Sequence, residues 1–202
     1  MDAHKLQLKI FLARDAAAGF DAETVIPVFH RWIKDRVLPE LTIDVANYLH
    51  VPQDPGVVLI GHGSDYFVDH GEGRWGLLHN RKRAGLPAAE RLSDLARRTL
   101  HAAALLEKEP ALAGKVRFAP GELLLRINDR LAAPNTDATF AALKAELEQL
   151  AQRLYAGPFE LQRIGTPKDL FAVRIVSGAA VSLPTLLDRA GGPPAADASL
   201  VA

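Results

Sequence analysis

Successive strand patterns between Val57 and Asn80, separated by glycine-rich turns, constrain the fold of this chain more than any other feature. The continuous apolar run over 57–60 is typical of a strand that is covered on both faces. Further strands are predicted over 65–70 and 73–80, with Gly71-Glu72 as a two-residue turn, because glycine tolerates a positive φ. The sequence therefore predicts a hairpin within a sheet.

The predicted turn also determines which side chains share a face. Asp69 is expected opposite Arg74 as a cross-strand ion pair, because directly opposed residues on neighbouring strands are in contact. Alternate side chains of a strand point to the same side of the sheet. One face of the hairpin is therefore predicted to enter the core, and it carries Tyr66, Val68, Trp75 and Leu77.

Alternation of strand and helix patterns along the chain indicates an α+β fold. Helices are predicted from Thr24, with Pro27 in the first turn, over 88–109, and from the loop at 131–135 to Leu154. Strands are predicted over 6–12, 41–45, 57–60, 65–70, 73–80, 115–118, 122–128, 159–164 and 170–176, with Pro120-Gly121 as a turn. We expect a largely antiparallel mixed sheet of seven to nine strands with three main helices.

The order of these elements suggests ferredoxin-like βαββ units and an internal duplication of 5–70 in 120–178. A shift of 115 residues superimposes the first strand and helix on the later ones, although the identities are mostly alanine and leucine. Under this hypothesis Arg14 and Asp15 correspond to Asp129 and Arg130, and the two loops would flank one cleft. The alternative is that βαββ units are simply common in α+β proteins.

Composition limits the domain count and the classes of partner. A chain of 202 residues suits one domain, predicted over 1–178, followed by a flexible tail over 179–202 that is rich in Ala, Gly and Pro. Within this tail, 183–189 is expected to form a helical turn. The 24 basic and 24 acidic residues balance, which argues against general nucleic-acid binding. The absence of cysteine excludes disulfides and thiol ligands. No apolar segment suggests a signal peptide or a membrane span, so a cytoplasmic location is expected.

Three residues of the central stretch form the candidate catalytic set, namely His62, Asp65 and His79. Two neutral imidazoles and a carboxylate are a usual set of metal ligands, and His62 with His79 is the pair predicted to hold a metal. Asp129 or Asp15 would complete such a site in a metal-dependent hydrolase. The alternative is a glycine-flanked turn in which a histidine bonds to the backbone.

A second candidate site would hold an anion. The run Arg81-Lys82-Arg83 precedes the helix predicted at Ala88, and charge together with backbone donors at a helix start favours phosphate or carboxylate. Trp75 and Arg130 are added to this predicted ligand-binding set. The glycines from Gly71 to Gly76 match G-x-G-x-x-G, but a strand follows them where a dinucleotide site needs a helix.

The sequence leaves two candidate functions. The preferred one is a non-catalytic binding or assembly protein that holds a small anionic ligand near 61–83 and forms a homo-oligomer through an uncovered sheet edge. The alternative is a metal-dependent hydrolase that uses the His/Asp set. The sequence does not identify a cofactor.

Overall fold

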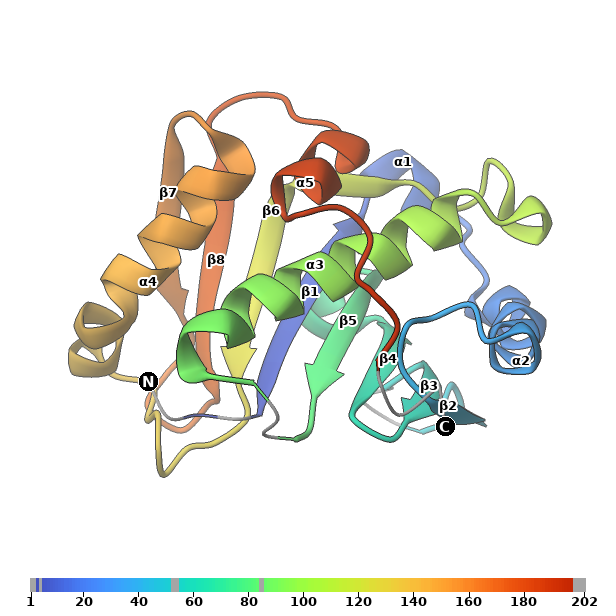
Figure 1. Ribbon diagram of the computed structural model, residues 1–202, viewed down its shortest axis with the longest axis horizontal. Helices are drawn as coiled ribbons and strands as arrows, with labels where there is room; N and C mark the ends of the chain where they lie inside the picture. The colour runs from blue at the N-terminus through green and yellow to red at the C-terminus, as the bar shows by residue number, and fades with distance from the viewer. Residues whose placement is uncertain (1–2, 4, 52–54, 84–85, 198–202) are drawn as a thin grey trace.

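A computed structural model describes residue 3 and residues 5–51, 55–83 and 86–197. One eight-stranded sheet forms the centre of the molecule, in the order β2-β3-β4-β5-β1-β6-β8-β7 (Figure 1). Every neighbouring pair is antiparallel, which confirms the α+β class. The strands are β1 (Leu6–Leu12), β2 (Thr42–Asn47), β3 (Val57–Gly61), β4 (Ser64–Asp69), β5 (Gly76–Arg81), β6 (Phe118–Ile127), β7 (Phe159–Ile164) and β8 (Phe171–Ser177).

The main helices pack on one face of this sheet. In Figure 1, α3, α4 and α5 all lie in front of the strands. The buried apolar side chains of these helices and of α2 belong to one hydrophobic cluster, which also contains alternate side chains of the strands. The helices are α1 (Arg14–Ala17), α2 (Ile26–Asp35), α3 (Ala88–Glu107), α4 (Asp137–Tyr155) and α5 (Leu183–Arg189), with 3-10 turns η1 (Ala22–Val25), η2 (Gly71–Gly73) and η3 (Pro110–Leu112).

Strand β1 lies in the middle of the sheet and is buried on both faces. Its side chains at positions 6, 8, 10 and 12 enter the helix-covered core. Those of Gln7, Lys9 and Phe11 point to the opposite face, because successive side chains of a strand alternate. Lys9 is fully buried, although it is charged.

The β4–β5 hairpin has the predicted faces but a different turn. Asp69 pairs with Gly76 and Val68 with Leu77, so the register is shifted by two residues from the predicted one. The connection over 70–75 is longer than the predicted turn and contains η2, with positive φ at Glu72 and Gly73. Because the shift is an even number of residues, Tyr66, Val68 and Leu77 still face the core, whereas Trp75 is half-buried.

Two further local predictions are corrected by the structure. The strands predicted over 115–118 and 122–128 are one strand, β6, which runs through Pro120-Gly121 without a turn. The helix predicted from Thr24 begins instead as η1, capped by the Asp21 side chain, and continues as α2 from Ile26.

The chain contains one clear βαββ arrangement in β6-α4-β7-β8. The internal duplication and a ferredoxin-like relationship remain hypotheses. The shared cleft does not form, because β1 and β6 are antiparallel and the loops that follow them therefore lie at opposite ends of this strand pair. Asp15 instead pairs with Arg117, and Arg130 donates to the backbone oxygen of Lys168 at 2.8 Å.

The segment predicted as a flexible tail from residue 179 contains a packed helix. α5 is capped by the Ser182 side chain and buries Leu183, Leu186 and Leu187 against the core. Its leucines lie one turn apart on a single face, and its bounds agree with the helical turn expected over 183–189. No helix in the described ranges is long and apolar enough to cross a membrane.

Candidate functional site

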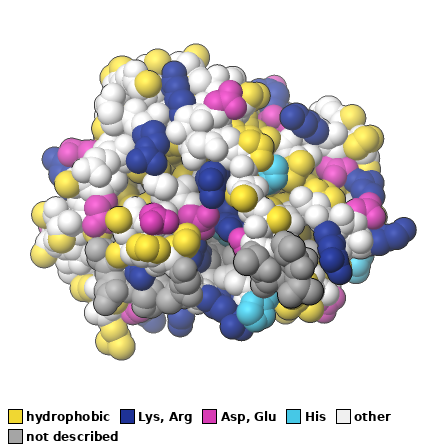
Figure 2. Space-filling view, in the orientation of Figure 1, with side chains coloured by type: hydrophobic (Ala, Val, Ile, Leu, Met, Phe, Trp, Pro, Cys, Tyr) yellow, Lys and Arg dark blue, Asp and Glu magenta, His cyan; other side chains and the backbone are white. Residues whose placement is uncertain are grey.

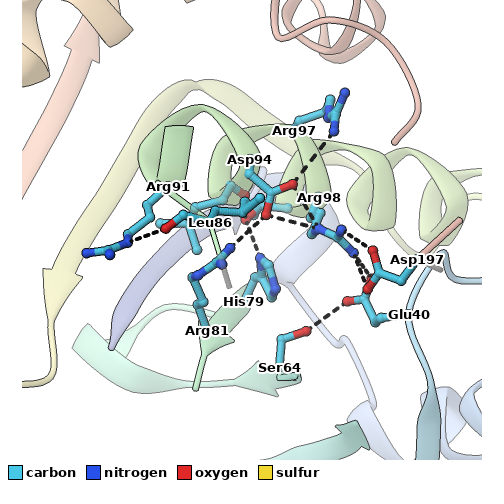
Figure 3. A network of polar contacts seen from close by, with 12 residues as sticks. Glu40, Ser64, His79, Arg81, Leu86, Arg91, Asp94, Arg97, Arg98 and Asp197 are labelled. Atoms are coloured by element: carbon cyan, nitrogen blue, oxygen red, sulfur yellow. Dashed lines mark hydrogen bonds and ion pairs between the residues drawn. The ribbon is translucent and has the colours of Figure 1, made fainter. Parts of the chain in front are cut away.

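A network of buried polar side chains lies between the sheet and α3, on the helix-covered face (Figure 3). We call it the helix-side network. It draws on the loop before β2, on β4 and β5, on α3 and on the C-terminal segment. Its members are Glu40, Ser64, Tyr66, His79, Arg81, Asp94, Arg97, Arg98, Thr99 and Asp197.

Glu40 is the buried acceptor at one end of this network, with 4% of its surface exposed. Its Oε1 accepts hydrogen bonds from Tyr66 and from Ser64 Oγ, the latter at 2.8 Å, and its Oε2 accepts from Arg98 Nη1 at 2.5 Å. Burial alone raises the pKa of Glu40, but the attraction of the Arg98 cation and the hydrogen bonds from Tyr66 and Ser64 outweigh it. The pKa of Glu40 is therefore lowered, and its carboxylate is charged.

His79 lies at the centre of the network as a neutral side chain. Its ring stacks on Tyr66 with 4.5 Å between ring centroids and 7° between planes. The Thr99 hydroxyl donates to the Leu95 carbonyl at 2.7 Å and lies 3.3 Å from His79 Nδ1, so Nδ1 carries the proton and donates to Thr99. Burial lowers the pKa of His79 to about 4 in spite of Glu40. Within the described structure, buried Nε2 has no hydrogen-bond partner.

Asp94 on α3 gathers three arginines around one buried carboxylate. Arg81 Nη1 donates to Asp94 Oδ2 at 2.8 Å, Arg98 Nε lies 3.0 Å from Oδ1, and Arg97 Nη2 lies 3.7 Å from Oδ1. Arg98 is shared, since it also contacts Glu40 and Asp197. Asp94 thus joins strand β5 to α3 and connects the buried network with the molecular surface.

A cavity of about 280 Å³ opens beside Asp94, between α3 and the end of α5. It is lined by Leu86, Glu90, Ser93, Asp94, Arg97, Arg153 and Ala190. A second cavity of about 330 Å³ between α3 and α4 shares Ser93 and Arg153 with the first. Figure 2 shows that basic and acidic side chains are interspersed on this face of the molecule.

A second charged cluster lies on the opposite face of the sheet, around Lys9. Its Nζ donates to Asp69, to the backbone oxygens of Gly71 and Arg74 at 2.9 and 3.0 Å, and to Glu72 Oε2 at 3.2 Å. Arg126, on β6, forms an ion pair with Glu72. Burial lowers the pKa of Lys9 more than the attraction of Asp69 raises it. This Lys9 cluster fastens the 70–75 connection to β1.

The predicted metal ligands are not brought together. His79 pairs across the strands with Tyr66, whereas Asp65 pairs with Asn80, so His79 and Asp65 point to opposite faces of the sheet. His62 is exposed in the turn between β3 and β4, four residues before Tyr66, which is the cross-strand partner of His79, whereas His79 is fully buried. No group of three or more His, Asp or Glu among the described residues has the arrangement of a metal site.

The predicted anion-binding residues are also divided by the sheet. Arg81 points to the helix side and pairs with Asp94, while Lys82 points to the other side and bonds Asp65 at 2.6 Å. Arg83 is exposed. Trp75, at the other end of β5, packs edge-on against Phe20 with 5.5 Å between ring centroids. Arg130 lies in the loop after β6. These five side chains therefore form no common pocket.

Several members of the helix-side network were not singled out from the sequence. Arg98 lies outside the leucine and alanine stripe of α3, at a position that usually faces water, yet it has only 13% of its side chain exposed. One signal was available: Asp94 and Arg98 are four residues apart on a helix, the spacing at which side chains meet. Glu40 and Asp197 carry no such signal, because Arg98, the partner that they share, is 58 and 99 residues away from them.

No protein-family model matches this chain, and no curated protein matches it significantly.

Proposed function

We propose that this chain is a non-catalytic binding protein that holds a small anionic ligand in the cavity between α3 and α5. The observation that carries the proposal is that two arginine side chains in the cavity wall use few of their hydrogen-bond donors. Among the described residues, Arg153 makes one hydrogen bond, to Ser93 Oγ at 3.0 Å, and Arg97 makes one long ion pair, with Asp94. A guanidinium has five N–H donors, so most of the donors of both side chains are available to a ligand.

The lining favours a particular ligand class. Arginine binds carboxylate and phosphate through two parallel hydrogen bonds, and a cavity of about 280 Å³ admits a small molecule rather than a polymer. Glu90 on the same wall is an acceptor. A small carboxylate or phosphate that also carries a hydroxyl or ammonium group would satisfy both charges.

The central hairpin supports this cavity without lining it. Arg81 at the end of β5 holds Asp94 in place, and Asp94 in turn forms part of the cavity wall. The proposed ligand site thus lies outside the 61–83 stretch at which the sequence suggested it, and the contact between Arg81 and Asp94 connects the two. The metal-dependent hydrolase has no comparable support, because His62, Asp65 and His79 lie apart.

The proposal is tested by thermal denaturation and calorimetry with a panel of small hydroxy acids, amino acids and phosphate monoesters. We expect at least one compound to raise Tm, and Arg153→Gln or Arg97→Gln to weaken its binding about tenfold or more, as for a lost charged hydrogen bond. Lys144→Gln, which removes an exposed charge on α4 outside this cavity, is the matched control. A panel without effect, or equal binding by the arginine variants, would refute the proposal.

Self-association, also expected from the sequence, stays a prediction. Strand β2 ends the sheet, and the segment over 41–51 exposes Leu41, Ile43, Tyr48 and Val51. An irregularity in the β2–β3 register between Thr42 and Asp44 makes this edge less regular than a simple pairing strand. Light scattering of the wild type and of Ile43→Asp tests the prediction, and a monomer at all concentrations would contradict it.

A further inference from the structure

The segment that follows α5 crosses α3 and reaches the helix-side network (Figure 1). We call residues 193–197 the C-terminal strap. α5 ends at two glycines with positive φ, and Gly192 donates to the Leu187 oxygen at 2.8 Å. Pro193-Pro194 then lack N–H donors. Among the described residues of the strap, only Asp197 makes a hydrogen bond or an ion pair.

Asp197 binds the outward edge of Arg98. Arg98 Nη2 lies 2.6 Å from Asp197 Oδ1, and Nη1 lies 3.5 Å from Oδ2, so the contact has two points. The inner donors of the same guanidinium are taken by Asp94 and Glu40 (Figure 3). Asp197 N also donates to the Pro39 oxygen at 2.7 Å. The strap therefore ends on a fixed, preoriented guanidinium.

The charges of the network balance only while Asp197 is in place. Arg81, Arg97 and Arg98 are linked by ion pairs to Asp94, Glu40 and Asp197, three cations to three anions, with His79 neutral. Without Asp197 one positive charge is left on Arg98. That side chain is mostly buried, whereas the side chain of Asp197 is 38% exposed. An uncompensated, partly buried charge attracts an anion more strongly than a solvated one.

We propose that the outward edge of Arg98 is an oxyanion-binding position. The Asp197 carboxylate fills it from within the chain, and a small carboxylate or phosphate fills it when the strap is released. Arg98 does not line the cavity between α3 and α5, so this position is separate from the ligand site proposed above. Strap and free oxyanion therefore compete for Arg98.

The first experiment measures binding of inorganic phosphate, and of acetate in parallel, by NMR titration of the α3 amides at constant ionic strength. Asp197→Asn keeps the shape of the side chain and removes its charge. Asp188→Asn is the matched control, an exposed carboxylate of α5 whose side chain has no hydrogen bond or ion pair in the described structure. We expect the apparent Kd of Asp197→Asn to be about tenfold lower than in the wild type or in the control, because a tethered carboxylate competes at millimolar effective concentration.

The second experiment follows the strap itself. The chain has no cysteine, so Ala195→Cys at an exposed position accepts a single fluorophore. Its anisotropy should fall in Asp197→Asn, and should fall in the wild type as phosphate is added.

Three results would overturn the proposal. One is equal phosphate binding by Asp197→Asn and Asp188→Asn. Another is an anisotropy that Asp197→Asn leaves unchanged. A third is loss of phosphate binding when Arg97→Gln is added to Asp197→Asn, since the anion would then lie in the cavity. Binding of both anions supports a general oxyanion position, and binding of phosphate alone assigns it to phosphates.

Discussion

The sheet carries a buried charged cluster on each face, and the two differ in how completely they are bonded. The Lys9 ammonium has three protons and four oxygen acceptors around it, one from Asp69 at the end of β4 and three from the connection that follows it. The helix-side network joins parts of the chain that are far apart in sequence. Within the described residues, it leaves His79 Nε2 and Arg81 Nε without hydrogen-bond partners. The first cluster is saturated and stabilises a turn, whereas the second retains bonding capacity and extends to a cavity.

Removing the cation of the saturated cluster should have the largest effect. Lys9→Met leaves the buried carboxylate of Asp69 without its partner. We expect the free energy of unfolding to fall by about 3–5 kcal/mol, as for a broken buried ion pair. Urea denaturation measures this, with the exposed Lys5→Met as control. Lys9→Met with Asp69→Leu should recover part of the loss, and a loss below about 1 kcal/mol for the single variant would show that the cluster behaves as a surface pair.

Acidification should act on the helix-side network through His79. An unfolded histidine binds a proton near pH 6.5, but folded His79 does so only at about 4. The unfolded state therefore holds more protons between these values, and the free energy of unfolding falls as the pH is lowered. From pH 7 to pH 5 this loss is about 2 kcal/mol.

The comparison of His79→Gln with the wild type isolates this contribution from that of other groups. Urea denaturation at both pH values should show a smaller loss in His79→Gln, while the exposed His30→Gln keeps the wild-type loss. Parallel pH dependence in the wild type and in His79→Gln would mean that His79 titrates normally and is not desolvated.

A smaller effect is expected for a neutral group of the same network. Thr99→Val keeps the shape of the side chain but removes the acceptor of His79 Nδ1. The expected loss of stability is about 1 kcal/mol, which is typical of one buried hydrogen bond. It should disappear in the His79→Gln background if the two side chains act together. Additive losses in that double-mutant cycle would separate Thr99 from the network.

Local patterns predicted the elements of the fold, and long-range contacts account for most of what they missed. Strand periodicity placed Tyr66, Val68 and Leu77 on the core face correctly, because an error of two residues in register preserves the faces. The turn length was wrong because Gly71-Glu72 resembles a tight turn, whereas the connection is held by Lys9 from a strand more than 60 residues earlier. No local pattern contains that contact.

The site was less predictable than the fold. Alternation along β5 and into the residue after it would have shown that Arg81 and Lys82 point to opposite faces, so this error came from treating a basic run as one patch. Two partners of Arg98, in contrast, could not have been found from any local pattern. Glu40 and Asp197 come from a loop before β2 and from the end of the described chain, and only the packed structure brings them together.

The central position of β1 also sets a requirement on folding during synthesis. β1 is made first, but one of its two neighbours, β6, begins at Phe118. At ribosomal rates of roughly 5–20 residues per second, β1 waits on the order of ten seconds for that partner. An apolar strand that waits this long with an unpaired edge is a template for pairing with other chains. Nascent chains of this protein are therefore expected to depend on chaperones until β6 has left the ribosome.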